Sequence, residues 1–146
     1  MPAPYQNAHT ESFTSRFGAR NGPSVEASVP GISIHVIDVT RGEPARAMAV
    51  TVFRLDGAAR VRVGGGPIGE AGLLDDAALG RGDGIGAGTD EVELAAGDYF
   101  RGCGLERRAP AFQETVLFRF SRVDAAEHAH LPVKRSPWGL SIWRGH

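Results

Sequence analysis

Histidines at two places in this chain could carry acid–base chemistry. His35 stands in an apolar, alternating stretch, and His128 and His130 form a His-x-His pair about ninety residues later. Imidazole has an unperturbed pKa of about 6.5 and exchanges protons near neutral pH more readily than other side chains. Two imidazoles in one pocket could divide a hydrolysis, with one activating water and the other protonating the departing nitrogen. The sequence therefore contains the parts of a general acid–base site.

The residues that follow the His-x-His pair add positive charge and aromatic area. Side chains alternate between the two faces of a strand, so His128, His130 and Lys134 share one face. Ser141 and Trp143 share a face of the last segment in the same way. If both faces border one hollow, the Lys134 ammonium could stabilise an oxyanion as it develops.

Each of these residues also has an ordinary interpretation. His35 could be a structural residue of an apolar strand, His128 a solvated neighbour, and Trp143 part of a subunit interface. A metal site is a further alternative, because His-x-His on a strand places two imidazoles on one face. His35 together with Asp38 or Glu127 could complete such a site.

Composition excludes several classes of function. The 146 residues have a formal net charge of −1 and no long cluster of Lys or Arg, which argues against nucleic-acid binding. The single Cys103 excludes an internal disulfide and a cysteine-based zinc site. No apolar stretch approaches the roughly 18 residues of a membrane span. The first twenty residues lack the apolar core of a secretory signal, so the expected location is the cytoplasm.

Short strands must position the candidate residues. Asp56-Gly57 predicts a hairpin, residues 97–104 predict one or two turns of helix, and the glycine-rich stretch 64–88 predicts loops with a short strand around Leu73 and Leu74. Residues 1–30 are expected to be a flexible or wrapping arm, and 31–146 to form a single, mostly β domain. The pattern predicts a two-sheet β-sandwich of seven or eight strands with one short helix. The other expected strands are 31–39, 48–55, 59–63, 91–94, 115–123, 130–135 and 140–144.

Motifs at both ends of this domain resemble those of one known family. Residues 127–132 (EHAHLP), 136–139 (SPWG) and 141–146 (SIWRGH) are similar to the C-terminal signature of 5-hydroxyisourate hydrolases. Residues 33–38 (SIHVID) resemble the N-terminal signature, and 97–100 (GDYF) the segment before the family's short helix. In order and spacing, residues 31–146 resemble the transthyretin and 5-hydroxyisourate hydrolase family.

This resemblance implies a transthyretin-like sandwich assembled as a homotetramer, a dimer of dimers, with active sites in the channel where the dimers meet. It implies hydrolytic opening of a small cyclic ureide, by cleavage of a C–N bond, without metal or organic cofactor. His35 and His130 match the family's catalytic histidines. Ser141, Arg144 and Gly145 match its terminal segment.

Four departures from the family pattern fall at or near the expected site. The usual Arg aligns with Leu73, the terminal Ser with His146, the usual Tyr with Trp143, and two aliphatic positions with Lys134 and Arg135. Lys134 is the candidate replacement for the Arg, although an ammonium is a point donor and a guanidinium is a planar fork. The predicted catalytic residues are His35, His130 and Lys134. The predicted substrate-binding residues are Ser141, Trp143, Arg144, Gly145 and His146.

The resulting hypothesis is a 5-hydroxyisourate hydrolase-like enzyme that acts on a cyclic ureide or a related cyclic amide. Two alternatives remain at the level of sequence. One is a divergent enzyme for another cyclic substrate in specialised metabolism, and the other is a non-catalytic module that binds a small ligand.

Overall fold

The computed structural model describes residues 30–146, so the predicted arm lies almost wholly outside the described residues. Eight strands and two short helices make up this part of the chain. In order they are β1 (Gly31–Asp38), β2 (Glu43–Pro44), β3 (Ala49–Asp56), β4 (Ala59–Pro67), α1 (Ala77–Arg81), β5 (Gly88–Leu94), α2 (Ala96–Gly102), β6 (Val116–Arg122), β7 (His128–Ser136) and β8 (Gly139–Ile142). The predicted mostly β class is confirmed.

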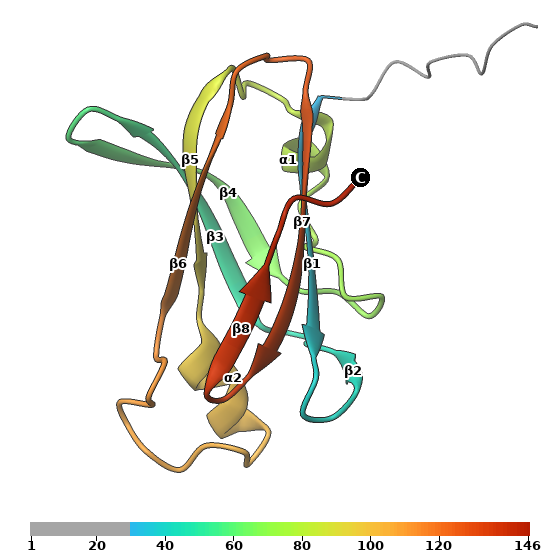
Figure 1. Cartoon of the computed structure of the whole chain (residues 1–146), viewed down its shortest axis with the longest axis vertical. Coiled ribbons are helices and arrows are strands. Elements are labelled where there is room, and N and C mark those ends of the chain that lie inside the picture. Colours follow the sequence, from blue (N-terminus) through green and yellow to red (C-terminus); the bar gives the residue numbers. More distant parts are fainter. Residues whose placement is uncertain (1–29) are drawn as a thin grey trace, which may run out of the picture.

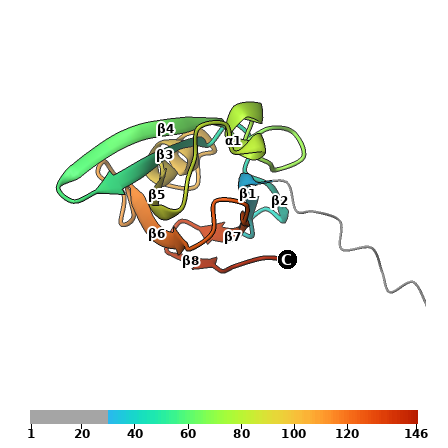
Figure 2. The same cartoon turned by 90° about the horizontal axis from the view of Figure 1, so that it is seen from above.

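The strands form two four-stranded sheets that pack face to face (Figure 1, Figure 2). One sheet has the order β2-β1-β7-β8 and the other β4-β3-β5-β6. β1 and β7 pair in parallel, whereas the pairs within the second sheet are antiparallel. The predicted sandwich is therefore present, and its first strand lies beside its penultimate one.

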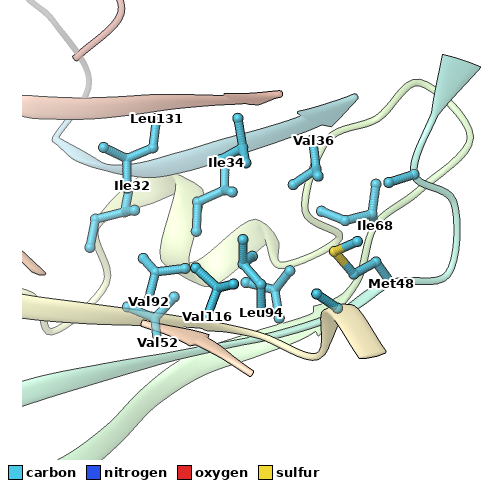
Figure 3. Packing of buried hydrophobic residues seen from close by; sticks show 14 of the residues in the cluster. Ile32, Ile34, Val36, Met48, Val52, Ile68, Val92, Leu94, Val116 and Leu131 are labelled. Atoms are coloured by element: carbon cyan, nitrogen blue, oxygen red, sulfur yellow. The ribbon is translucent and has the colours of Figure 1, made fainter. Parts of the chain in front are cut away.

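The core lies between the two sheets, where the alternating apolar positions meet. Ile32, Ile34 and Val36 of β1 are at most 1% exposed and face Val52, Val92 and Leu94 of the opposite sheet (Figure 3). Burying a side chain of this size stabilises the fold by about 1.5–3 kcal/mol. Because β1 buries its even-numbered residues, Ser33, His35 and Ile37 point to the outer face of the sandwich.

The region 64–88 is more structured than its composition predicted. β4 continues through three glycines, where any side chain at Gly65 would place a Cβ 2.4 Å from the carbonyl oxygen of Val50. Residues 77–81 form α1, so the expectation of a single short helix was wrong. Asp76 caps this helix by accepting a hydrogen bond from Leu79 N, and Leu79 is buried. The predicted strand at Leu73 and Leu74 is reduced to isolated bridges to His35 and Ile68.

The predicted helix at 97–104 is present as α2, and it closes one end of the sandwich (Figure 1). Tyr99 and Phe100 are buried, and the Tyr99 hydroxyl donates to Asp38 Oδ2 at 3.0 Å. Glu114 accepts hydrogen bonds from Arg101 and from Ala111 N, which fastens the segment that leads into β6. Within residues 30–146, no helix is long and apolar enough to cross a membrane.

Candidate active site

Three rows of side chains cover the outer face of the sheet β2-β1-β7-β8. The parallel register pairs Ser33 with His130, His35 with Pro132, and Ile37 with Lys134. Successive rows are two residues apart along the strands, or about 6.6 Å. His35 therefore lies in the middle row, with His130 on one side of it and Lys134 on the other.

The segment after β8 extends these rows on the far side of β7. Gly145 N donates to the His130 carbonyl at 2.8 Å, and Trp143 N to the Pro132 carbonyl at 3.4 Å. Trp143 thus stands beside the middle row, and Ser141 pairs in register with Lys134. The residues around Pro132 on this face therefore include two imidazoles, an ammonium and an indole.

His35 is held by the backbone of the glycine-rich segment. Its Nε2 is 3.0 Å from the Ala71 carbonyl oxygen. A carbonyl can only accept, so Nε2 carries a proton and Nδ1 is the nitrogen left for chemistry. Gly72 packs on the ring so closely that a Cβ there would lie 2.6 Å from Nε2. Its φ of +87° is also one that glycine adopts most readily.

His130 is tied to a second imidazole through a hydroxyl. Ser33 Oγ is 2.7 Å from His130 Nδ1 and 2.8 Å from His128 Nε2. His128 is therefore more than a solvated neighbour. Burial lowers the pKa of His130 below its ordinary value, and the charges of His128 and His35 lower it further. A neutral His130 at neutral pH can accept a proton.

Lys134 and Trp143 form the cationic side of the site. The Lys134 ammonium lies 5.6 Å from the centroid of the Trp143 ring, within the range of a cation–π contact. Lys134 is exposed and lies on the same face as His130. Leu73 forms a bridge with His35 and is about half exposed. The residue aligned with the family's Arg is therefore next to His35 but carries no charge.

The remaining predicted residues are Arg144, Gly145 and His146. Gly145 packs on His130, because a Cβ there would lie 2.5 Å from His130 Cδ2. The Arg144 guanidinium pairs with Glu127 at 2.6 Å and lines a hollow of about 90 Å³ together with His130. His146 is exposed at the end of the chain. The structure gives Arg144 an ion-pair partner and gives Gly145 a packing role.

The metal alternative is not supported by the placement of its acidic residues. Asp38 is fully buried on the inner face of β1, where it binds Tyr99 and Arg41, so it points away from His35. The Glu127 carboxylate forms an ion pair with Arg144. Within residues 30–146, no group of three His, Cys, Asp or Glu side chains is arranged to hold a metal ion.

Ser33, Ala71 and Gly72 were not identified from the sequence. Ser33 lies two residues before His35 and therefore on the same face of β1, which the sequence indicates. Its contacts, however, depend on the register between β1 and β7. The carbonyl of Ala71 carries no side-chain signal at all. A larger cavity of about 380 Å³, lined by Arg41, Tyr99 and Cys103 among others, lies beside α2 and contains none of the predicted site residues.

Comparison with known proteins identifies the family to which this geometry belongs. A family model described as HIUase/Transthyretin matches residues 32–145. The chain belongs to the HIUase/transthyretin family. Over 114 residues it is 39% identical to 5-hydroxyisourate hydrolase 2 of Rhizobium meliloti, with coverage of 78% of this chain and 94% of the relative. It is 40% identical to 5-hydroxyisourate hydrolase of Mesorhizobium japonicum, with coverage of 78% and 90%.

Two solved structures have a similar fold over about four fifths of this chain. (S)-allantoin synthase is similar with a TM-score of 0.70 and 29% identity, over 82% of this chain and 45% of that one. The Klebsiella pneumoniae 5-hydroxyisourate hydrolase is similar with a TM-score of 0.63 and 24% identity, over 80% and 99%. The second likeness concerns the fold alone.

Proposed function

We propose that this member of the HIUase/transthyretin family hydrolyses 5-hydroxyisourate by histidine-based general acid–base catalysis. The observation that carries the proposal is the row arrangement of His35, His130 and Lys134 on one outer face. The relatives that match over 90% or more of their length, and are 39–40% identical, are 5-hydroxyisourate hydrolases, which favours this substrate over another cyclic amide.

His130 acts as the general base in this proposal. Its Nδ1 faces Ser33, so Nε2 is the nitrogen available to a water molecule above Pro132. The lowered pKa keeps the ring neutral near pH 7 and able to accept a proton. The water oxygen attacks a ring carbonyl carbon of the ureide as its proton moves to Nε2, and an oxyanion forms. General acid–base assistance of this kind contributes roughly 10²–10⁴-fold.

Lys134 and His35 complete the reaction. The Lys134 ammonium stabilises the oxyanion, and Trp143 stacks on the planar ring. When the tetrahedral adduct collapses, the ring C–N bond breaks. His35, which enters this step with protons on both ring nitrogens, protonates the leaving nitrogen through Nδ1. The product carries a freed N–H and a new carboxylic acid, which releases its proton to solvent and becomes a carboxylate. A proton returns from His130 to His35 through solvent, so the cycle balances.

We further propose that the enzyme is a homotetramer in which a second dimer covers the outer face. In a single chain this face is open, and Trp143 on it is 42% exposed. Trp138, in the turn between β7 and β8, is 63% exposed. Excluding bulk water strengthens the electrostatic interactions of an active site. A second dimer packed on the outer face would exclude it. The single Cys103, unable to form an internal disulfide, suits the proposed cytoplasmic location.

The test is the decay of ultraviolet absorbance of freshly generated 5-hydroxyisourate. Wild-type protein should accelerate the decay far above the spontaneous rate. His35→Ala and His130→Ala should each remove at least about 100-fold of kcat. Both variants should unfold at the same urea concentration as wild type, since both rings lie outside the core. Full activity in both variants would contradict the acid–base assignment. Decay at the spontaneous rate in the presence of wild type would contradict the proposal that 5-hydroxyisourate is the substrate.

A further inference from the structure

The Ser33 hydroxyl lies between two imidazoles, and the proposed reaction uses only one of them. Ser33 is half-buried on β1, directly opposite His130 in the parallel register. His128 lies two residues earlier on the same face of β7. The distances of 2.7 and 2.8 Å from Oγ to the two ring nitrogens are those of hydrogen bonds.

The number of protons in this bridge is fixed by its chemistry. A hydroxyl has one proton, so Ser33 can donate to only one of the two rings. The other ring must then donate to Oγ. When both rings are neutral, one and only one of His128 Nε2 and His130 Nδ1 carries a proton.

This leaves two arrangements. If Ser33 donates to His130 Nδ1, then His130 carries its proton on Nε2 and cannot act as a base there. If Ser33 donates to His128 Nε2, then His130 Nδ1 donates to Oγ and its Nε2 is unprotonated. Only the second arrangement fits a general base whose Nε2 faces the ligand.

We propose that Ser33 is a positioning residue that connects His128 to His130 as a proton relay. This proposal rests on the proposed hydrolase function. As His130 Nε2 takes the proton of water, Nδ1 passes its own proton to Ser33 Oγ, and Ser33 passes its hydroxyl proton to His128 Nε2. The hydroxyl is regenerated, His130 remains neutral, and the positive charge ends on His128. The relay then runs in reverse, and His130 Nε2 releases the proton to solvent.

The surroundings of His130 favour moving the charge away. Burial penalises a charge on His130, and the positive charges of His128 and His35 add to the penalty. Other charged groups that line the hollow with His130 are Arg122, Glu127 and Arg144, and Glu127 pairs with Arg144. Lys134 lies four residues further along the same face of β7. The relay places the charge one ring further from the reacting carbonyl.

The experiment compares Ser33→Ala with Ser33→Thr. Ser33→Ala should lower kcat by about 10- to 100-fold, part of the full acid–base contribution, with KM changed less than about threefold. The acidic limb of its pH–rate profile should move, because that limb reports protonation of the general base and His130 must then hold its own charge. Ser33→Thr retains the hydroxyl on a strand residue and should restore most of the rate. Ser121→Ala removes a hydroxyl from the opposite sheet, where it bonds Thr89, and is the matched control.

Nitrogen-15 NMR of the imidazole rings gives a readout independent of turnover. In wild type, His130 should carry its proton on Nδ1, and the titrations of His128 and His130 should be linked. In Ser33→Ala the two rings should titrate separately.

Three results would overturn the relay: wild-type kcat and pH profile in Ser33→Ala, a Ser33→Thr variant as impaired as Ser33→Ala, or the same tautomers and titrations with and without the hydroxyl. If wild type does not hydrolyse 5-hydroxyisourate, the proposed function fails, and the NMR comparison alone decides for or against the relay.

Discussion

Lys134 and Arg135 are consecutive residues whose side chains lie on opposite faces of β7. Lys134 is exposed beside Trp143 on the outer face. Arg135 is fully buried, binds Gln113 and the Gly139 carbonyl, and lies over the ring of Phe100. Burial lowers the pKa of Arg135, because its charge has lost most of its contact with water. Only Lys134 can therefore reach a ligand above Pro132.

This difference predicts a ranking of two matched substitutions. Lys134→Met should reduce kcat/KM by about 10²–10³-fold, as expected for the loss of an oxyanion donor. Arg135→Met should change kcat/KM less than about threefold, since methionine retains an apolar packing volume at an inward-facing position. Steady-state kinetics on 5-hydroxyisourate measures both. The reverse ranking would mean that the outer face is not the catalytic one.

Gly72 is a residue on which the position of His35 depends. Gly72→Ala forces a side chain into a left-handed conformation and against the His35 ring. The strain should cost about 1–3 kcal/mol of unfolding free energy, and displacement of His35 should lower kcat at least tenfold. Gly69→Ala is the control in the same segment, because its Cβ would be 3.4 Å from the nearest atom, the Leu73 carbonyl. Equal effects of the two substitutions in urea unfolding and kinetics would contradict this role.

At the scale of elements, Glu114 fastens α2 to the start of β6. Hydrogen bonds from the Arg101 guanidinium and from Ala111 N lower the pKa of Glu114 to about 2. A carboxyl whose pKa is lower in the folded state than in the unfolded chain stabilises the fold above its unfolded pKa, here 4.5. That contribution is lost as the pH falls from 4.5 towards 2.

The measurement is urea unfolding of wild type and Glu114→Gln at several pH values. The variant should be less stable at pH 7, and the difference should shrink as the pH falls from 4.5 to 2. Asp98→Asn is the control, because Asp98 binds the same Arg101 but its side chain is 81% exposed. A constant difference across the range, or an equal effect of Asp98→Asn, would contradict the assignment.

Most elements could be predicted because their local signals agree with their final environment. In β6, Val116, Phe118 and Phe120 alternate with more exposed residues, and this period appears in the burial pattern. α1 could not be predicted, because its five residues are too few for a helical period. It depends on the Asp76 cap and on burial of Leu79 against β1 and β4. The extension of β4 was missed because glycines carry no strand signal.

At the scale of the whole molecule, the proposed tetramer can be tested by light scattering. We expect a mass of about four times the 15.5 kDa of one chain. Trp143→Lys places a charge on the exposed outer face and should reduce the mass. Val61→Lys adds the same charge on the projecting hairpin of β3 and β4, where Val61 is 56% exposed, and should leave the mass unchanged (Figure 1). A monomeric wild type would contradict the proposal.

The candidate site was predictable in its residue types but not in its connections. The outward direction of His35, His130 and Lys134 could be predicted, because side chains alternate between the two faces of a strand and the sequence shows this alternation. Their assembly into adjacent rows depends on the parallel pairing of β1 with β7. The alternation within one strand specifies neither the neighbouring strand nor the register. The Ser33 bridge and the Ala71 carbonyl follow only from that pairing.

The distance along the chain between Ser33 and His130 also matters while the protein is being made. The two residues are separated by 97 positions, so the ribosome must add all of the intervening residues before they can meet. A product of interrupted translation that stops before residue 130 contains at most one member of the pair. Such a fragment lacks the reactive arrangement, so the chemistry arises only in chains that extend beyond residue 130.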